Sequence, residues 1–110
     1  MPLFIEAEPD PTSDLYILKE SVIIEGIKIN KGEKWNGASI PRILWPLIGS
    51  PFTPKLMAPS LVHDFMCKSK RGRRDKKTHK LLKKLLIANG VKKSVANIMY
   101  AGVRLWSLTQ

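Results

Sequence analysis

The sequence is poor in the features that define several large protein classes. Its one cysteine, Cys67, excludes an internal disulfide framework and a cysteine-rich zinc site. No apolar run approaches the roughly 18–20 residues that a bilayer-spanning helix needs, so we expect no membrane span. The first ten residues are acidic and lack the basic start of a secretory signal, so we expect a protein that stays in the cytoplasm.

Acidic residues are scarce and unevenly placed. The 110 residues include 19 Lys or Arg and 9 Asp or Glu, which gives a net charge of +10. Seven acids precede residue 34, whereas the stretch 68–93 holds twelve basic residues and a single acid, Asp75. Such an asymmetry favours an anionic partner at one end, whether nucleic acid, a lipid surface or an acidic protein face.

Hydrophobic residues make up 44% of the chain, enough for one modest core, and we predict a single α+β domain over residues 1–110. Residues 1–13 are expected to be an extended arm. Residues 14–35 combine strand-forming runs with Gly turns and predict a small antiparallel β-meander. Residues 36–57 are interrupted by Pro and Gly and predict an irregular apolar loop. Residues 58–106 have apolar residues at helical spacing and predict three α-helices.

The apolar loop is the least ordinary part of this plan. Its centre, Ile43–Phe52, carries Trp, Phe, Ile and Leu, which water normally drives into a core. We expect it to pack over the helix that carries His63 and Asp64, or to be covered by a partner protein.

Candidate catalytic residues lie on the first two predicted helices. His63 and Asp64 are neighbours, so their side chains diverge by about 100° and each needs a partner elsewhere. Asp75 and His79 are four residues apart, which places them on one face of the next helix. A helical hairpin would bring either of them opposite His63. A histidine polarised by a carboxylate is a general base that activates water.

The alternatives for these residues remain open. His63 and Asp64 would equally serve as a buried polar pair, with Asp64 binding amides of the turn that follows Trp35. Two His and two Asp are also ligand types for a metal, but their spacing matches no metal signature, and we predict no metal or cofactor. In the turn itself, Asn36 and Ser39 would bond the local backbone.

Arg42 follows this turn and would pair with Asp64 or Asp75.

The densest positive charge falls in the link between the first two predicted helices and in the first turn of the second. Aromatic residues are absent there, so the pattern favours sequence-independent contact with phosphate rather than stacking on bases. A simple solvated face is the alternative. The candidate anion-binding residues are Lys68, Lys70, Arg71, Arg73, Arg74, Lys76 and Lys77.

Several of these segments together resemble a family of small proteins of unknown function, found chiefly in tailed-phage and prophage genomes. The family pattern reads roughly D-G-A-S-x-P-R, W-P, V-H-D-x-L-Y, A-D-x-x-F, G-V and M-Y-x-x-V-R, and the resemblance covers about residues 27–104. The matching segments here are N-G-A-S-I-P-R (36–42), W-P-L-I-G (45–49), L-V-H-D (61–64), A-N-G-V (88–91) and M-Y-A-G-V-R (99–104).

The resemblance implies a phage protein with a compact fold, made in the host cytoplasm and either kept there or incorporated into the virion. Other phage proteins, in a virion or tail assembly, are the partners that it implies. Asn36 replaces the family's first Asp, and Cys67 replaces the Tyr after H-D. The A-D-x-x-F position aligns with either Asp75 or His79. These changes weaken an enzymatic interpretation, and we expect a non-enzymatic protein that docks through its apolar loop and basic surface.

The predicted hairpin alone is similar to the catalytic hairpin of secreted-type phospholipases. This similarity implies a hydrolase in which His63 is the base, Asp64 a calcium ligand or support, and Asp75 the orienting acid. The disulfides and the glycine-rich calcium loop of those enzymes are missing here. A hydrolase acting on a lipid, cell-wall or phosphoester substrate therefore stands as the first alternative function, and sequence-independent nucleic-acid binding as the second.

Overall fold

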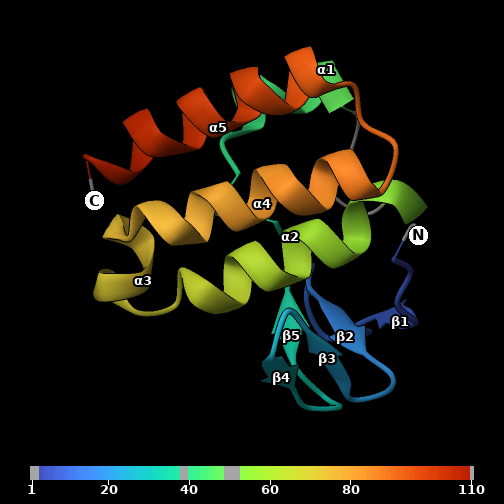
Figure 1. Cartoon of the computed structure of the whole chain (residues 1–110). Coiled ribbons are helices and arrows are strands. Elements are labelled where there is room, and N and C mark those ends of the chain that lie inside the picture. Colours follow the sequence, from blue (N-terminus) through green and yellow to red (C-terminus); the bar gives the residue numbers. More distant parts are fainter. Residues whose placement is uncertain (1–2, 38–39, 49–52, 110) are drawn as a thin grey trace.

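A computed structural model describes residues 3–37, 40–48 and 53–109, and its α+β fold confirms the predicted class (Figure 1). Short strands occupy the N-terminal third and helices the remainder. The strands are β1 (Ala7–Pro9), β2 (Tyr16–Leu18), β3 (Val22–Ile24), β4 (Ile27–Ile29) and β5 (Lys34–Trp35). The helices are the 3₁₀ turn η1 (Arg42–Leu44), α1 (Trp45–Ile48), α2 (Pro54–Met66), α3 (Lys70–Arg74), α4 (Lys76–Ala88) and α5 (Lys93–Ser107).

The strands form two small antiparallel sheets. One has the order β1-β2-β5, and the other is the β3–β4 hairpin. Glu25 and Gly26 connect the two strands of the hairpin, with positive φ angles of 52° and 77°. Positive φ at both residues is typical of the two-residue turn whose twist matches that of the strands. The predicted antiparallel strands are therefore present, but β2 pairs with β5 rather than with β3, so they form two sheets instead of one continuous meander. The extended arm is corrected, because Ala7–Pro9 pairs with Tyr16–Leu18 as a strand.

Three long helices form the other layer. In Figure 1, α2 lies next to the sheets, α4 lies against α2, and α5 lies on the far side of α4. One core joins the sheets to α2, and a second joins α4, α5 and the segment before η1. The buried residues of the first are Leu18, Ile24, Ile29, Trp35, Ala58, Leu61, Val62 and Leu85. Those of the second are Ile40, Leu56, Leu82, Leu86, Ala96, Met99 and Val103.

Helix α2 begins at Pro54, one turn earlier than the predicted start at residue 58. Pro54 is tolerated in a first turn, but Pro59 lies inside the helix and cannot donate to the carbonyl of Lys55. Asn89 supplies the missing donor, because its Nδ2 lies 2.9 Å from that carbonyl oxygen. A side chain at the end of α4 thus stabilises a proline-containing turn of α2.

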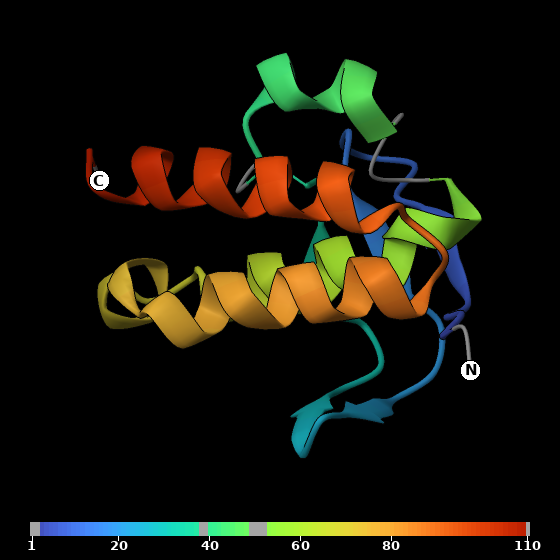
Figure 2. The ribbon, with the colours of Figure 1, turned by 45° about the horizontal axis from the view of Figure 1, so that its top comes forward.

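The predicted apolar loop is more regular and differently placed than expected. Its described part contains η1 and α1, with Pro46 tolerated in the first turn of α1. Figure 2 shows this segment beside α5 rather than over the C-terminal end of α2. Leu44 packs so closely on Gly102 of α5 that a Cβ there would lie 2.5 Å from Leu44 Cδ1. The expectation that this part covers His63 is therefore wrong, and Gly49–Phe52 lie outside the described residues.

The basic link is also helical. Ser69 caps α3 by accepting a hydrogen bond from the amide of Gly72 at 2.9 Å. A Cβ on Gly72 would lie 1.8 Å from the carbonyl oxygen of Met66, so only glycine permits this tight return. The three predicted long helices are confirmed, and α1 and α3 are short additions.

Candidate functional site

The predicted histidines meet where α2 and α4 converge. His63 Nε2 lies 2.9 Å from His79 Nδ1, and both side chains are buried. The two rings are tilted by 55°, with centroids 5.1 Å apart. The hairpin was expected to bring Asp75 or His79 opposite His63, and the structure selects His79.

The neighbouring carbonyl determines which histidine donates in the His63–His79 hydrogen bond. His79 Nε2 lies 2.8 Å from the carbonyl oxygen of Arg73, which only accepts, so this nitrogen carries the proton. In the neutral ring Nδ1 is then an acceptor, and His63 Nε2–H donates to it. Two consecutive hydrogen bonds therefore connect α2 to α4 and α4 to the backbone of α3.

Cys67 lies one helical turn after His63 and is buried beside it. Its Sγ is 3.7 Å from His63 Nε2 and 3.9 Å from Nδ1. A cysteine beside a histidine is a nucleophile when the imidazolium stabilises the thiolate. We did not select Cys67 as a site residue, although its spacing of four residues from His63 was a signal for it.

Burial decides the charge state of this cluster. Desolvation, assisted by the neighbouring His79, lowers the pKa of His63 to about 3. Desolvation is also the main cause that lowers the pKa of His79, and Arg104 acts in the same direction. Arg73, through its carbonyl, and Asp75 oppose that shift. Both rings are therefore neutral at pH 7, and neither provides the imidazolium that would activate Cys67.

Asp64 connects α2 to the turn after β5. Its Oδ2 accepts hydrogen bonds from the amides of Gly37 at 2.9 Å and Asn36 at 3.4 Å. Gly37 has φ of +74°, a conformation that glycine adopts without strain. The predicted hydrogen bonds from the amides of this turn to Asp64 are confirmed, and Asn36 is half-buried in the turn. Ser39 lies outside the described residues.

Asp75 does not orient His63. It is exposed and caps α4, where its carboxylate accepts the amide of Lys77 at 2.9 Å. Its expected position at the start of a helix is confirmed, but the His63–Asp75 pairing is corrected, because His79 Nδ1 lies against His63 Nε2.

Arg42 likewise departs from its predicted pairing with Asp64 or Asp75. Its guanidinium carbon lies 5.2 Å from the ring centroid of Trp45, in a cation–π contact at the surface of the apolar segment.

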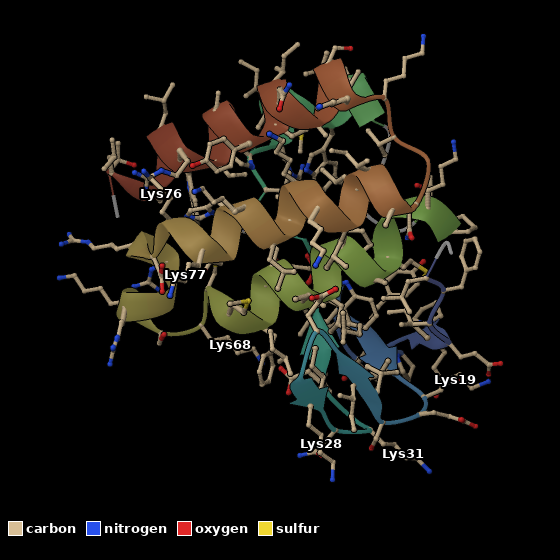
Figure 3. The ribbon with its side chains drawn as sticks, viewed as in Figure 1. Lys19, Lys28, Lys31, Lys68, Lys76 and Lys77 are labelled. Carbon is tan, nitrogen blue, oxygen red and sulfur yellow. The ribbon has the colours of Figure 1, made fainter. Side chains whose placement is uncertain are left out.

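Some of the predicted anion-binding residues are engaged within the fold. Lys68 pairs with Glu33 next to β5, and Arg73 Nη1 donates to the carbonyl of Cys67 at 3.3 Å. Figure 3 shows Lys76 and Lys77 at the end of α4 next to α3, far from Lys28 at the sheet end. The remaining predicted residues are exposed: Lys70, Arg71, Arg74, Lys76 and Lys77.

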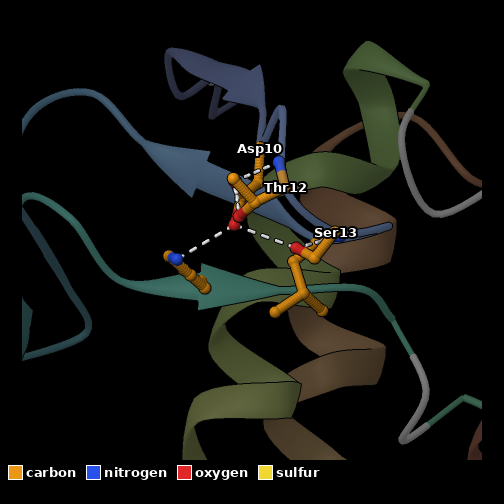
Figure 4. A network of polar contacts seen from close by, with 5 residues as sticks. Asp10, Thr12 and Ser13 are labelled. Atoms are coloured by element: carbon orange, nitrogen blue, oxygen red, sulfur yellow. Dashed lines mark hydrogen bonds and ion pairs between the residues drawn. The ribbon is translucent and has the colours of Figure 1, made fainter.

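A second polar cluster, which we did not predict, holds the N-terminal segment to the sheet. Asp10 accepts from the Thr12 amide and hydroxyl and from the Ser13 hydroxyl, and it forms an ion pair with Lys34 at 2.9 Å (Figure 4). These contacts, led by the Thr12 amide, lower the pKa of Asp10. The signal was the P-D-P-T-S sequence, since Asp bonds backbone two residues ahead in such turns.

The described residues contain no group of three or more His, Cys, Asp or Glu side chains placed to hold a metal ion. Within that same part of the chain, no helix has the length and apolar character needed to cross a membrane.

Comparison with known families matches residues 13–103 to a "protein of unknown function" family, DUF1353. The chain belongs to the DUF1353 family. The matched range starts just before β2 and ends in α5, so it includes His63, Asp64 and His79.

Two uncharacterized proteins of Sinorhizobium fredii are similar to this DUF1353 chain. One, y4jT, is 34% identical over 102 residues, which are 91% of this chain and 30% of the relative. The other, y4iH, is 33% identical over 78 residues, which are 71% of this chain and 32% of the relative. This chain therefore spans about a third of the length of each relative. No solved structure matches it significantly.

Proposed function

We propose that this DUF1353 protein is a non-enzymatic docking component that holds an anionic partner on the basic surface of α3 and α4. The observation that carries the proposal is the number of exposed cations that lack a carboxylate partner. Among the described residues, Lys68 pairs with Glu33 and Lys84 with Glu25, whereas Lys70, Arg71, Lys76, Lys77 and Lys80 have no carboxylate within ion-pair distance. We define the basic surface as Lys70, Arg71, Lys76, Lys77 and Lys80.

The charge on this surface exceeds what an amphipathic helix needs. Helix α4 buries Leu82, Leu85 and Leu86, which is enough to fix its orientation without the cations. Five exposed cations on two consecutive helices are suited to phosphate or carboxylate groups, which they contact without reading sequence.

The geometry of the histidines argues against the hydrolase alternative. His63 is 1% exposed, and its Nε2 proton is donated to His79. A general base needs access to water and a pKa near the working pH. His63 has neither property, so we assign the pair a structural role.

The assembly that we propose is a tailed-phage or prophage particle, with the protein made in the host cytoplasm and then incorporated. The resemblance of the N-G-A-S-I-P-R, L-V-H-D and M-Y-A-G-V-R segments to phage proteins supports this origin. The apolar segment supports a second contact, because Ile43 is 84% exposed and Leu47 is 47% exposed. Exposed apolar residues of this size favour burial by a partner.

Quantitative mass spectrometry of purified particles tests the assembly. We expect the protein in particles at a constant ratio to a major structural protein after density-gradient purification. A protein that is abundant in the lysate but absent from the particles would contradict the proposal.

A further inference from the structure

A groove lies between α4 and α5, which run side by side (Figures 1 and 2). Its volume is about 380 Å³, and the residues that line it are Lys80, Lys83, Lys84 and Ile87 of α4 and Tyr100 of α5. The α4 residues have the spacing i, i+3, i+4 and i+7, so they form one stripe along that helix. Because Lys80 belongs to the basic surface, that surface continues into the groove.

The groove combines an apolar lining with positive charge. Ile87 is 38% exposed, and Tyr100 is half-buried. The lysines add apolar surface, because a lysine stem packs along apolar neighbours while its ammonium group stays in water. A ligand that fills this groove therefore needs an apolar group and negative charge close together.

The three ammonium groups differ in what they contact. Lys83 Nζ lies 5.8 Å from the ring centroid of Tyr100, in a cation–π contact. Lys84 pairs with Glu25 at 3.0 Å, but both side chains are exposed, so an incoming carboxylate replaces Glu25 at small cost. In the part of the chain that the structure describes, Lys80 has no carboxylate within ion-pair distance.

We infer that the groove binds an acidic segment of a partner protein, which sets an apolar side chain on Ile87 and Tyr100 and carboxylates against the lysines. The inference rests on the proposed function and names the class of its anionic partner. A buried apolar anchor surrounded by polar contacts is the usual arrangement of a protein–protein contact.

The groove fits nucleic acid and lipid anions less well. Duplex DNA keeps its bases stacked inside, so it brings phosphate to the lysines but nothing to fill the apolar lining. An unpaired base stacks on a free aromatic face, whereas Lys83 lies over the ring of Tyr100. A fatty-acid anion has one carboxylate for three lysines, whereas acidic residues on both sides of an apolar residue supply several.

Isothermal titration calorimetry with two synthetic peptides tests the inference. One peptide has Glu on both sides of a single Phe, and the other has Ser in place of Phe, so both carry the same charge. The parent protein should bind the Phe peptide about tenfold more tightly, because the groove removes the ring from water.

Ile87→Asn should remove most of this difference and leave the affinity for the Ser peptide unchanged, since the variant keeps every cation. Ile23→Asn is the matched control, because Ile23 is 72% exposed on the β3–β4 hairpin, and it should keep the full difference. Duplex DNA and phosphatidylglycerol vesicles should bind the parent and Ile87→Asn alike, since they contact only the cations. Thermal midpoints show that each variant is folded.

Equal affinity of the parent for the two peptides would overturn the inference and leave the proposed function standing, because both peptides would still bind through the cations. A preference for Phe that survives Ile87→Asn would also overturn it, as would vesicles that need Ile87 when the Phe peptide does not. If neither peptide nor DNA binds at low salt, the proposed function fails together with the inference.

Discussion

At the scale of single residues, His63 and His79 act as a buried, neutral hydrogen-bonded pair. Their contacts join three helices, since His63 is in α2, His79 is in α4 and the accepting carbonyl of Arg73 is in α3. The sequence predicted that Asp75 or His79 would face His63, because these positions follow from helical spacing, and the structure selects His79. The sequence did not reveal the bond to Arg73, because the position of α3 depends on the close approach of Gly72 to Met66.

Replacing His63 by Ala should lower stability by about 2–4 kcal/mol, because it leaves a cavity and an unpaired His79 nitrogen. The thermal midpoint, followed by circular dichroism, measures this loss. Asp75→Ala is a useful comparison, since loss of an exposed helix cap costs only about 1 kcal/mol. A His63→Ala protein as stable as the parent would show that the pair is not structural.

The pair should also make stability depend on pH. Burial lowers the pKa of His63 from 6.5 to about 3, and it lowers the pKa of His79 as well. Between pH 6.5 and 3 the unfolded chain therefore binds more protons than the folded chain. Stability is therefore greatest above pH 6.5 and decreases as the pH falls toward 3. Thermal midpoints from pH 7 to 5 test this, because Asp10, with an ordinary pKa of 3.8, contributes little there.

A double variant, His63→Gln with His79→Gln, should be less stable than the parent but should have a flatter pH dependence in this window. An equally steep dependence in the variant would assign the effect to other groups.

At the scale of elements, apolar spacing and capping residues predicted α4 and α5 well. Contacts between distant segments were not predictable, because no local pattern records them. Asn89 is the clearest case: the sequence marks it only as part of a helix end, yet its side chain binds the backbone of Leu3 as well as that of Lys55. The pairing of β1 and the packing of Leu44 on α5 are further contacts between distant segments that the sequence did not predict.

Asn89→Ala should therefore destabilise the protein by about 2–4 kcal/mol, since several partly buried hydrogen bonds are lost and their backbone partners remain. Asn97→Ala, on the exposed side of α5, is the matched control and should change stability by less than about 0.5 kcal/mol. Chemical denaturation of both variants measures the difference. Equal midpoints for the two would mean that Asn89 does not stabilise Pro59 and the N-terminal segment.

At the scale of the whole molecule, opposite ends have different charge. The acids of the N-terminal segment lie with the sheets, and the basic surface lies at α3 and α4 (Figures 1 and 3). The charge asymmetry was visible in the sequence. The structure changes which residues are candidates, because Lys68 and Arg73 are engaged within the fold and Lys80 joins the surface.

The central claim is that the basic surface docks an anionic partner, and the salt dependence of binding to duplex DNA, used as a model polyanion, tests it most directly. A triple variant with Lys70, Arg71 and Lys77 changed to Gln should bind more weakly at low salt. Its log–log salt slope should fall by up to about 2.7, since each lost phosphate contact removes about 0.9. The control changes Lys19, Lys28 and Lys31 to Gln, which removes the same charge from the sheet end, and should keep the parent slope. Equal slopes for the two variants would contradict the claim.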